Sequence, residues 1–558
     1  MFKQHFMRIR LKADHQTLNP LLEPNVKAQL SVFGITATGD EIVIPHALIK
    51  YNISTILTCG DADVATVDSN GMVTPLNGGY VKIEATYVGV GLGLSDSIKI
   101  VIRPFYHDYH TTLTYKLFMA MEPYGSLWKE NDGKRDSSVY INIEEAFTII
   151  RDLDVVTGGM PKIVYLVGWQ KGGHDHGYPD IHTPNPRLKR DCDMDAAASI
   201  RWLMREARKY HTTVSLHVNL VDAWEDSPLW KEYHEKHILV ENPDGTVANA
   251  GGGFSVFPEK YGINVGLVSQ RRLWDTGEFQ KRFAELLDVF PELTDAHTIH
   301  IDNWRAVSFP TMGISKQDDE EAIRLMYIYL RRIGLDATSE GSSYGRNEPM
   351  TGLQPMTWWD IPYHPSIIPP CLYCGGRAGR LENDPRFGDS IHVESTVKVN
   401  LQRGLPTLNG LQDEFCLYTL PWHFLNSFQL EQFDGNNAVY SHNVKAFMEN
   451  GVPVILWNKT RIRYGSTVFV PLLWSKKQQI MLYSFRDTYY ITSMPETWQD
   501  VKSVDMYYID PLGREQPYLE ICDHKIQDGE LRIPIDPHSA FIMVPHNEDA
   551  PRYMDLCY

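Results

Sequence analysis

Cysteine is scarce in this chain of 558 residues. The seven cysteines are scattered and odd in number, which argues against a disulfide framework. The two closest, Cys371 and Cys374, have the CxxC spacing of zinc and redox sites, but no second CxxC or HxxxH motif accompanies them. We therefore expect free thiols in a loop at this point of the chain.

Long apolar runs are also missing. No stretch approaches the roughly 20 residues that a membrane-spanning helix needs, and residues 1–16 lack the apolar centre of a signal peptide. We therefore expect no membrane insertion. The chain as written is expected in the cytoplasm, with secretion or cell-surface display as the alternative if an export signal precedes it.

Positive charge is in deficit. Lysine and arginine number 53 against 70 aspartates and glutamates, which gives a formal net charge of -17, and no basic block stands out. Nucleic acid and anionic membrane surfaces are therefore not expected partners. Apolar residues make up 43% of the chain, so this is an ordinary globular composition whose length predicts roughly two to four domains.

Residues 1–103 alternate short β-type runs with turns rich in Gly, Asn and Asp, a pattern that predicts a small β-sandwich. Within it, residues 64–87 read VATVDSNGMVTPLNGGYVKIEATY. A strand ending in VD, a turn, a short strand, a Gly pair and a third strand resemble the group 2 bacterial Ig-like repeat. The resemblance implies a spacer or a binding accessory.

Residues 104–465 change to strands followed by helices, which predicts a TIM-like (β/α)8 barrel with insertions. The predicted buried strands are residues 118–122, 162–168, 213–220, 297–302 and 334–340. The predicted helices between them include residues 143–153, 195–210, 278–290 and 319–334. Further on, residues 437–451 are expected to form a helix and residues 452–457 a strand.

Residues 466–558 return to β-type runs separated by turns, and we expect a C-terminal antiparallel β-sandwich there. The predicted fold is thus a multidomain chain whose barrel is flanked by two β domains. Such a layout is frequent in carbohydrate-active enzymes, and the comparison is an analogy at the level of the fold.

Three predicted strand ends carry carboxylates, at Asp302, at Glu340 and in the loop of residues 168–180, and barrels place their catalytic groups at that position. Asp302 ends the strand in HTIHIDNW, and Glu340 follows the next strand in LDATSE, 38 positions later. Neighbouring strand ends can bring two carboxyl groups to about 5 Å, where one attacks a sugar carbon and the other protonates the leaving oxygen. The alternative for either residue is a helix cap or a loop salt bridge.

The loop GWQKGGHDHGYPD, residues 168–180, is crowded with polar and aromatic side chains. His174 and His176 could bind a metal as the HxH motif of metal-dependent amidohydrolases does, with His217, Asp222 or Asp302 as partners. The lysine ligand and the spacings of that family are not evident.

The same loop could bind a sugar. One aspartate would accept hydroxyl protons, a neighbouring histidine would donate, and Trp169 or Tyr178 would stack on the ring. A solvated Gly-rich loop remains the third alternative.

The loop, followed in order by HIDNW and TSEGS, resembles the catalytic barrel of the endo-α-N-acetylgalactosaminidases and related α-N-acetylgalactosaminidases. These are retaining glycoside hydrolases that act on mucin-type O-glycans, and the resemblance covers roughly residues 105–460. It implies that Asp302 is the nucleophile and Glu340 the acid/base. The loop residues that it implies for sugar binding are Gly173, His174, Asp175, Pro179 and Asp180.

Three tryptophans, Trp304, Trp358 and Trp359, are candidate walls of the sugar pocket, with core packing as the alternative. We expect the substrate to be α-linked N-acetylgalactosamine or Galβ1-3GalNAc on an O-glycan or glycopeptide, with no cofactor and no metal. Release of one sugar or of a disaccharide stays open. The competing hypotheses are a metal-dependent hydrolase and a carbohydrate-binding protein without catalysis.

Overall fold

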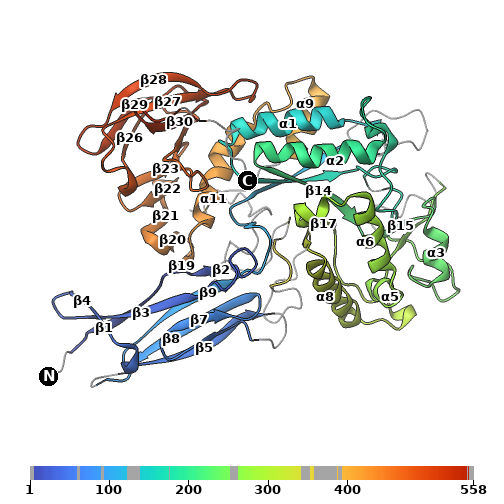
Figure 1. Ribbon diagram of the computed structural model, residues 1–558, viewed down its shortest axis with the longest axis horizontal. Helices are drawn as coiled ribbons and strands as arrows, with labels where there is room; N and C mark the ends of the chain where they lie inside the picture. The colour runs from blue at the N-terminus through green and yellow to red at the C-terminus, as the bar shows by residue number, and fades with distance from the viewer. Residues whose placement is uncertain are drawn as a thin grey trace. The chain divides into compact units, whose positions relative to one another are not determined.

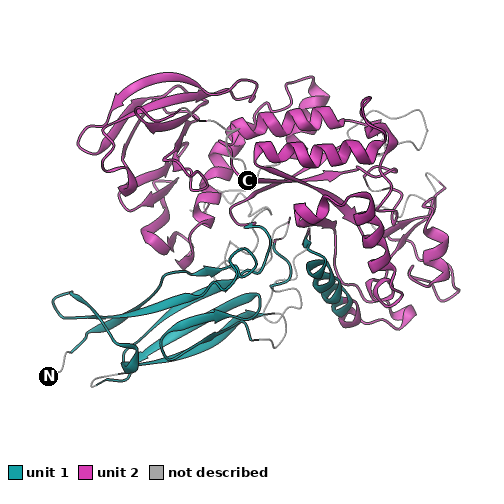
Figure 2. Ribbon diagram, viewed as in Figure 1, with its two compact units in different colours: residues 1–108, 320–337, 342–355 teal, residues 109–319, 338–341, 356–558 magenta. Residues whose placement is uncertain are grey.

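The computed structural model divides the chain into two compact units, residues 1–108, 320–337 and 342–355 in the first and residues 109–319, 338–341 and 356–558 in the second (Figure 2). No described helix is long and apolar enough to cross a membrane. The structure describes residues 5–58, 63–89, 93–121, 138–174, 176–251, 262–340, 352–356, 358, 386, 393–549 and 551.

The first unit contains two β-sheets that share one hydrophobic core. One sheet has the order β1-β3-β7-β6, with β4 paired to β3, and the other has the order β2-β9-β8-β5. Alternate residues of β3 are buried, so one face of that strand supplies Leu30 and Val32 to the core while Ile83 and Ile100 come from the other sheet. The strands are β1 (Arg8–Ala13), β2 (Thr17–Leu18), β3 (Ala28–Ile35), β4 (Glu41–Val43), β5 (Ile49–Thr58), β6 (Ala65–Val67), β7 (Met72–Pro75), β8 (Gly79–Tyr87) and β9 (Ser95–Ile102).

The three strands expected within residues 64–87 are therefore present as β6, β7 and β8. The turn between the first two begins with Asp68, whose side chain accepts the backbone N–H groups of Asn70 and Met72. Gly71 in this turn has a positive φ of 75°. The Ig-like character of the module stays a prediction.

The second unit is built around a five-stranded sheet with the order β10-β13-β14-β17-β18. The pairs β10/β13, β13/β14 and β14/β17 are parallel. Every residue of β13 is buried, as expected for a parallel strand that is covered on both faces. The strands are β10 (Leu113–Phe118), β13 (Lys162–Val167), β14 (Thr212–Asn219), β17 (Thr298–Asp302) and β18 (Asp336–Ser339).

The helices that accompany this sheet begin where the sequence places their caps. Asn142 and Glu145 form a reciprocal capping box at the start of α1, and Asp195 accepts the N–H of Ala198 at the start of α2. Helices α1 and α2 lie side by side next to β14 (Figure 1). The helices predicted from periodicity are α1 (Ile143–Val156), α2 (Ala196–Glu206) and α6 (Glu278–Val289) in the second unit, and α8 (Lys316–Arg332), most of which belongs to the first unit.

One predicted strand is displaced. The strand expected over residues 118–122 lies earlier, as β10, and only a short strand β11 (Ala120–Met121) follows it. The strand was predicted too late in the sequence because Lys116 interrupts the apolar run of residues 113–118. In the structure this lysine is buried and paired with Glu340. The described strands form an open parallel sheet, so closure into an eight-stranded barrel stays a prediction.

The C-terminal part of the second unit is an antiparallel sheet of ten strands, as expected in kind. It begins at Leu430, ahead of the boundary predicted at residue 466. Its order is β19-β20-β21-β22-β23-β24-β25-β30-β27-β28, and a smaller sheet pairs β26 with β29. The strands are β19 (Leu430–Phe433), β20 (Asn437–Tyr440), β21 (Val444–Glu449), β22 (Val452–Trp457), β23 (Thr460–Tyr464), β24 (Thr467–Pro471), β25 (Ile480–Ser484), β26 (Tyr489–Ser493), β27 (Ser503–Ile509), β28 (Tyr518–Lys525), β29 (Glu530–Pro534) and β30 (Ser539–Pro545).

The helix predicted over residues 437–451 is wrong, because β20 and β21 occupy this stretch. Val444 and Ala446 are buried while Lys445 between them is exposed, which is the alternation of a strand. Asn450 and Gly451 both have positive φ angles, 51° and 80°, and connect β21 to β22 as a two-residue hairpin turn. The Asn-Gly pair was the sequence signal for this hairpin.

Candidate active site

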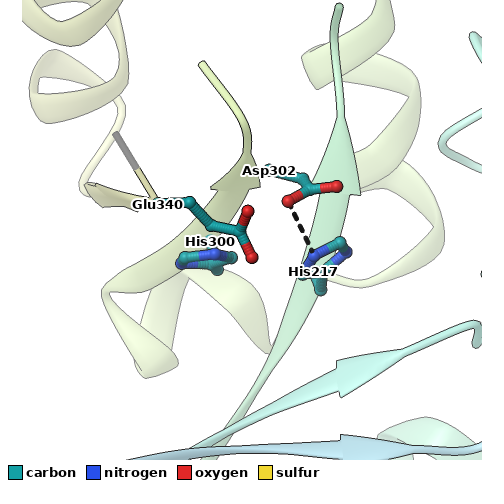
Figure 3. A group of neighbouring side chains, drawn as sticks. All are labelled: His217, His300, Asp302 and Glu340. Carbon is teal, nitrogen blue, oxygen red and sulfur yellow. Dashed lines mark ion pairs between the residues drawn. The ribbon is translucent and has the colours of Figure 1, made fainter. Parts of the chain in front are cut away.

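Four polar side chains meet at the carboxyl edge of the parallel sheet. His217 comes from β14, and His300 and Asp302 come from β17. Glu340 directly follows β18. One nitrogen or oxygen atom of each lies within 4.8 Å of the corresponding atoms of the other three (Figure 3). The two carboxylates predicted as a pair therefore lie together, because neighbouring parallel strands end at the same edge.

The register of β14 against β17 builds this cluster. His217 is paired with His300, and Asn219 is paired with Asp302. Since side chains two positions apart share a face of a strand, His300 and Asp302 point to the same side of the sheet. The rings of His217 and His300 have centroids 5.2 Å apart, and His217 Nε2 lies 3.6 Å from Asp302 Oδ1.

A lysine also belongs to this site. Lys116, on β10, forms an ion pair with the carboxylate of Glu340. Its Nζ lies 4.8 Å from the centre of the Trp358 ring, within the range of a cation–π interaction. Sequence reasoning missed Lys116, although a lysine inside the otherwise apolar strand LTYKLF was a signal.

The histidines of the site are held neutral. Burial lowers the pKa of His217 to about 3, and the charge of Lys116 acts in the same direction. Burial and the neighbouring His217 lower the pKa of His174 to about 3 as well. The pKa of His300 lies well below 6.5, again through burial. The Nδ1 atom of His300 forms a 2.8 Å hydrogen bond with Thr338 Oγ1, which orients the ring.

The loop after β13 brings His174 to the cluster. It starts at Gly168, whose φ is 70° and where a Cβ atom would lie 1.7 Å from the carbonyl oxygen of Ala120. Only glycine fits this bend. The ring of His174 then lies 5.0 Å from that of Phe118 and 5.6 Å from that of His217, measured between centroids. Asp175 and Trp359 lie outside the described residues.

Two later residues of the same loop, His176 and Asp180, contact residues outside the carboxylate cluster. Asp180 accepts the backbone N–H groups of His182 and Thr183. His176 lies beside Asp226, with Nε2 at 3.0 Å from Oδ2. These two predicted loop residues, Asp180 and His176, line a pocket of about 240 Å³ together with Asp226. The structure therefore brings His174, but not Asp180 or His176, to the carboxylate cluster.

The predicted tryptophans occupy different positions. Trp358 lies at the cluster, where its ring is 5.6 Å from that of His300 and its backbone N–H donates to the carbonyl of Ser339. Trp304 is buried and donates its indole N–H to Gln270. Trp169 is fully buried and donates to the carbonyl oxygen of His217, so it supports strand β14 from within the core.

A third carboxyl group lies close by. Asp222 follows β14, and its Oδ2 accepts a hydrogen bond from Asn219 Nδ2 at 2.8 Å. Burial raises its pKa to about 6, and the charge of Asp302 adds to this effect. Sequence reasoning had named Asp222 only as a possible metal partner.

The sequence of residues 144–333 matches the model of a glycoside hydrolase family described as endo-alpha-N-acetylgalactosaminidase. The matched segment contains the loop from Gly168, strands β13, β14 and β17, and Asp302, and it ends before Glu340. The resemblance inferred from the sequence motifs is thus confirmed over this segment. A search of curated proteins found no match to this chain.

Solved structures are similar to the chain only at a low level. The ligand-free alpha-N-acetylgalactosaminidase NagBb from Bifidobacterium bifidum has 9% identity and a TM-score of 0.41, with 80% of this chain and 91% of that chain covered. A maltogenic amylase from S. marinus has 10% identity and a TM-score of 0.38, with 94% of this chain and 81% of that chain covered. A likeness at this level carries no argument about activity.

Proposed function

Since residues 144–333 match the endo-α-N-acetylgalactosaminidase family, we propose that this chain is a retaining glycoside hydrolase that acts on α-linked N-acetylgalactosamine. Its substrate would be an O-glycan or a glycopeptide, from which it releases N-acetylgalactosamine or the disaccharide Galβ1-3GalNAc. The proposed reaction is a double displacement with Asp302 as the nucleophile and Glu340 as the acid/base.

The separation of the two carboxylates carries this proposal. One oxygen of Asp302 and one of Glu340 lie within 4.8 Å of each other. Retaining glycosidases place their carboxyl groups about 5–5.5 Å apart, whereas inverting enzymes need roughly 6.5–9.5 Å to admit a water molecule between them. The short separation therefore favours direct attack by a carboxylate.

In the first step, a carboxylate oxygen of Asp302 attacks the anomeric carbon while Glu340 donates its proton to the glycosidic oxygen. The bond to the aglycone breaks, and the sugar becomes an ester of Asp302. In the second step, Glu340 takes a proton from water, whose oxygen attacks the same carbon and displaces Asp302. Two inversions restore the α configuration.

The neighbouring side chains suit these roles. The ammonium of Lys116 contacts Glu340 and would stabilise its ionised form, which is the form that takes a proton from water in the second step. The neutral imidazole of His217 lies 3.6 Å from Asp302 and leaves its negative charge available for attack.

Sugar binding is assigned within the same proposal. His174 lies at the cluster and would donate to a hydroxyl group, with Asp175 beside it in the sequence as the acceptor. Trp358 and Trp304 would form walls of the pocket. The buried Trp169 and the turn-forming Asp180 would support the loop and not contact the sugar.

Turnover of aryl α-N-acetylgalactosaminide and aryl Galβ1-3GalNAc α-glycosides tests the proposal, and proton NMR identifies the first anomer released. We expect the α anomer first. An Asp302→Asn variant should lose roughly 10⁴-fold or more in kcat/KM, because the nucleophile is gone. Asp226→Asn, which changes a carboxylate of the neighbouring loop, is the matched control. A fully active Asp302→Asn enzyme, or release of the β anomer, would contradict the proposal.

Two alternatives are separated by the same measurements. A metal-dependent hydrolase built on His174 and His176 would be stopped by chelators, but these histidines have different partners and neither belongs to a metal-capable group among the described residues. A carbohydrate-binding protein without catalysis would bind the aryl glycosides and release no aglycone.

A further inference from the structure

Two buried histidines at the active site have ring nitrogens that nothing in the described part of the chain satisfies. Neither ring nitrogen of His217 has a hydrogen-bond partner, and Nε2 of His300 also lacks one. The two side chains are 1% and 0% exposed. Buried polar groups in proteins normally have a hydrogen-bond partner, so these nitrogens point to a ligand.

Thr338 donates its hydroxyl proton to the carbonyl oxygen of Ile299, so its Oγ1 can accept the Nδ1–H of His300. The Nδ1 atom of His300 is engaged with Thr338 Oγ1 at 2.8 Å, which leaves Nε2 as the ring nitrogen with a free lone pair. Histidines that bind a metal through one ring nitrogen commonly form a hydrogen bond through the other.

The cluster also has the composition and size of a metal site. It offers two imidazole nitrogens and two carboxylate oxygens, and the four atoms lie within 4.8 Å of one another. Ligands at about 2.0–2.2 Å from Zn²⁺ in a tetrahedron are roughly 3.3–3.6 Å apart, so small side-chain rotations would close the site. All four residues lie on or directly after the neighbouring strands β14, β17 and β18. Figure 3 shows their side chains close together.

We propose that this cluster binds a divalent transition-metal ion such as Zn²⁺ when no glycoside is present. His217 and His300 would each supply a ring nitrogen, and Asp302 and Glu340 would each supply a carboxylate oxygen. Lys116 contacts one oxygen of Glu340, so the ion would use the other oxygen or displace the ammonium. The two carboxylates leave the site with a net negative charge even when Lys116 is counted.

An ion held in this way would occupy the carboxylates that the proposed function assigns to catalysis. The metal and a glycoside would then exclude each other, and Zn²⁺ would be a competitive inhibitor. This consequence depends on the proposed function, whereas binding of the metal does not.

Zn²⁺ binding is measured by calorimetry and by equilibrium dialysis with elemental analysis, on the full-length protein freed of metal and without substrate. We expect one ion per chain. His300→Ala should weaken binding about 100-fold or more through loss of a ligand, and Thr338→Val about 10- to 100-fold through loss of the orienting contact. His423→Gln, which changes a buried histidine outside the cluster, should bind Zn²⁺ like the unmodified protein.

Circular dichroism establishes whether each variant is folded. If His300→Ala does not fold, Thr338→Val still tests the proposal. Absence of stoichiometric Zn²⁺ binding would overturn the proposal, as would equal affinity in the Thr338→Val and His423→Gln variants. Zn²⁺ bound at this cluster without any inhibition of aryl-glycoside hydrolysis would overturn the shared-site consequence. Binding in a protein that hydrolyses no glycoside would support the metal site and contradict the proposed function.

Discussion

At the scale of single residues, Lys116 places a cation in contact with one of the two proposed catalytic carboxylates. It is buried inside β10 with its side chain 6% exposed, and its partner Glu340 is 19% exposed. A buried charge of this kind is tolerated because its counter-ion is in contact. The same lysine adds to the low pKa of His217, so one cation influences both an acidic and a basic neighbour.

We predict that Lys116→Met destabilises the protein by about 3 kcal/mol, because Glu340 is left half-buried without its counter-ion. The double variant Lys116→Met/Glu340→Gln should regain most of this free energy, since no unpaired charge remains. Urea unfolding of both single variants and the double variant measures the coupling. If the double variant loses as much free energy of unfolding as the two single variants together, the Lys116–Glu340 ion pair does not contribute to stability as described.

At the scale of secondary-structure elements, the bend after β13 decides whether His174 reaches the cluster. Gly168 directly follows the buried strand and adopts a left-handed backbone conformation with φ of 70°. The carbonyl oxygen of Ala120 lies 1.7 Å from where a Cβ atom of residue 168 would stand, and it also accepts the N–H of His174. Strand β11 and the loop are therefore packed too closely for any side chain.

Gly168→Ala is expected to destabilise the protein by about 3 kcal/mol or more, through backbone strain combined with the clash against Ala120. Gly277→Ala is the matched control, since Gly277 has a φ of 76° but no atom within 4 Å of an added Cβ. That variant should lose only about 1–2 kcal/mol, the cost of the left-handed conformation alone. Thermal and urea unfolding compare the two variants. Equal losses in the free energy of unfolding would show that the clash with Ala120 contributes nothing.

At the scale of the whole molecule, buried histidines make stability depend on pH. Burial lowers the pKa of His174 and His217 to about 3 and that of His423 to about 4. In the unfolded chain these imidazoles titrate near their ordinary value of about 6.5. Below that pH the unfolded state binds more protons than the folded state, so stability falls as the pH decreases from about 6.5 toward 3. Asp222, whose pKa is raised to about 6, contributes in the opposite direction.

We predict that each of these histidines lowers the free energy of unfolding by about 1.4 kcal/mol for each unit by which the pH decreases near pH 5. His423→Gln should reduce the slope of stability against pH by that amount, because it removes one such group away from the active site. Urea unfolding at pH 7, 6 and 5 measures the slope. An unchanged slope in the variant would contradict the assignment of a neutral buried His423.

The sequence alone determined the local elements and the positions of the two carboxylates at strand ends. Caps such as Asn142 and apolar runs such as residues 162–168 specify helices and strands through short-range contacts. For this reason the sequence alone predicts that Asp302 and Glu340 lie together. The hairpin over residues 437–457 was also present as an Asn-Gly signal, but its apolar spacing resembled that of a helix.

Only the tertiary structure decided which distant residues surround that pair. Lys116 is separated from Glu340 by 224 positions, and His217 meets His300 through the register of β14 against β17. Such contacts depend on how strands are ordered in the sheet, and no local pattern encodes that order. Burial then sets the charge of each group, so the neutral histidines beside two carboxylates are a property of the folded chain.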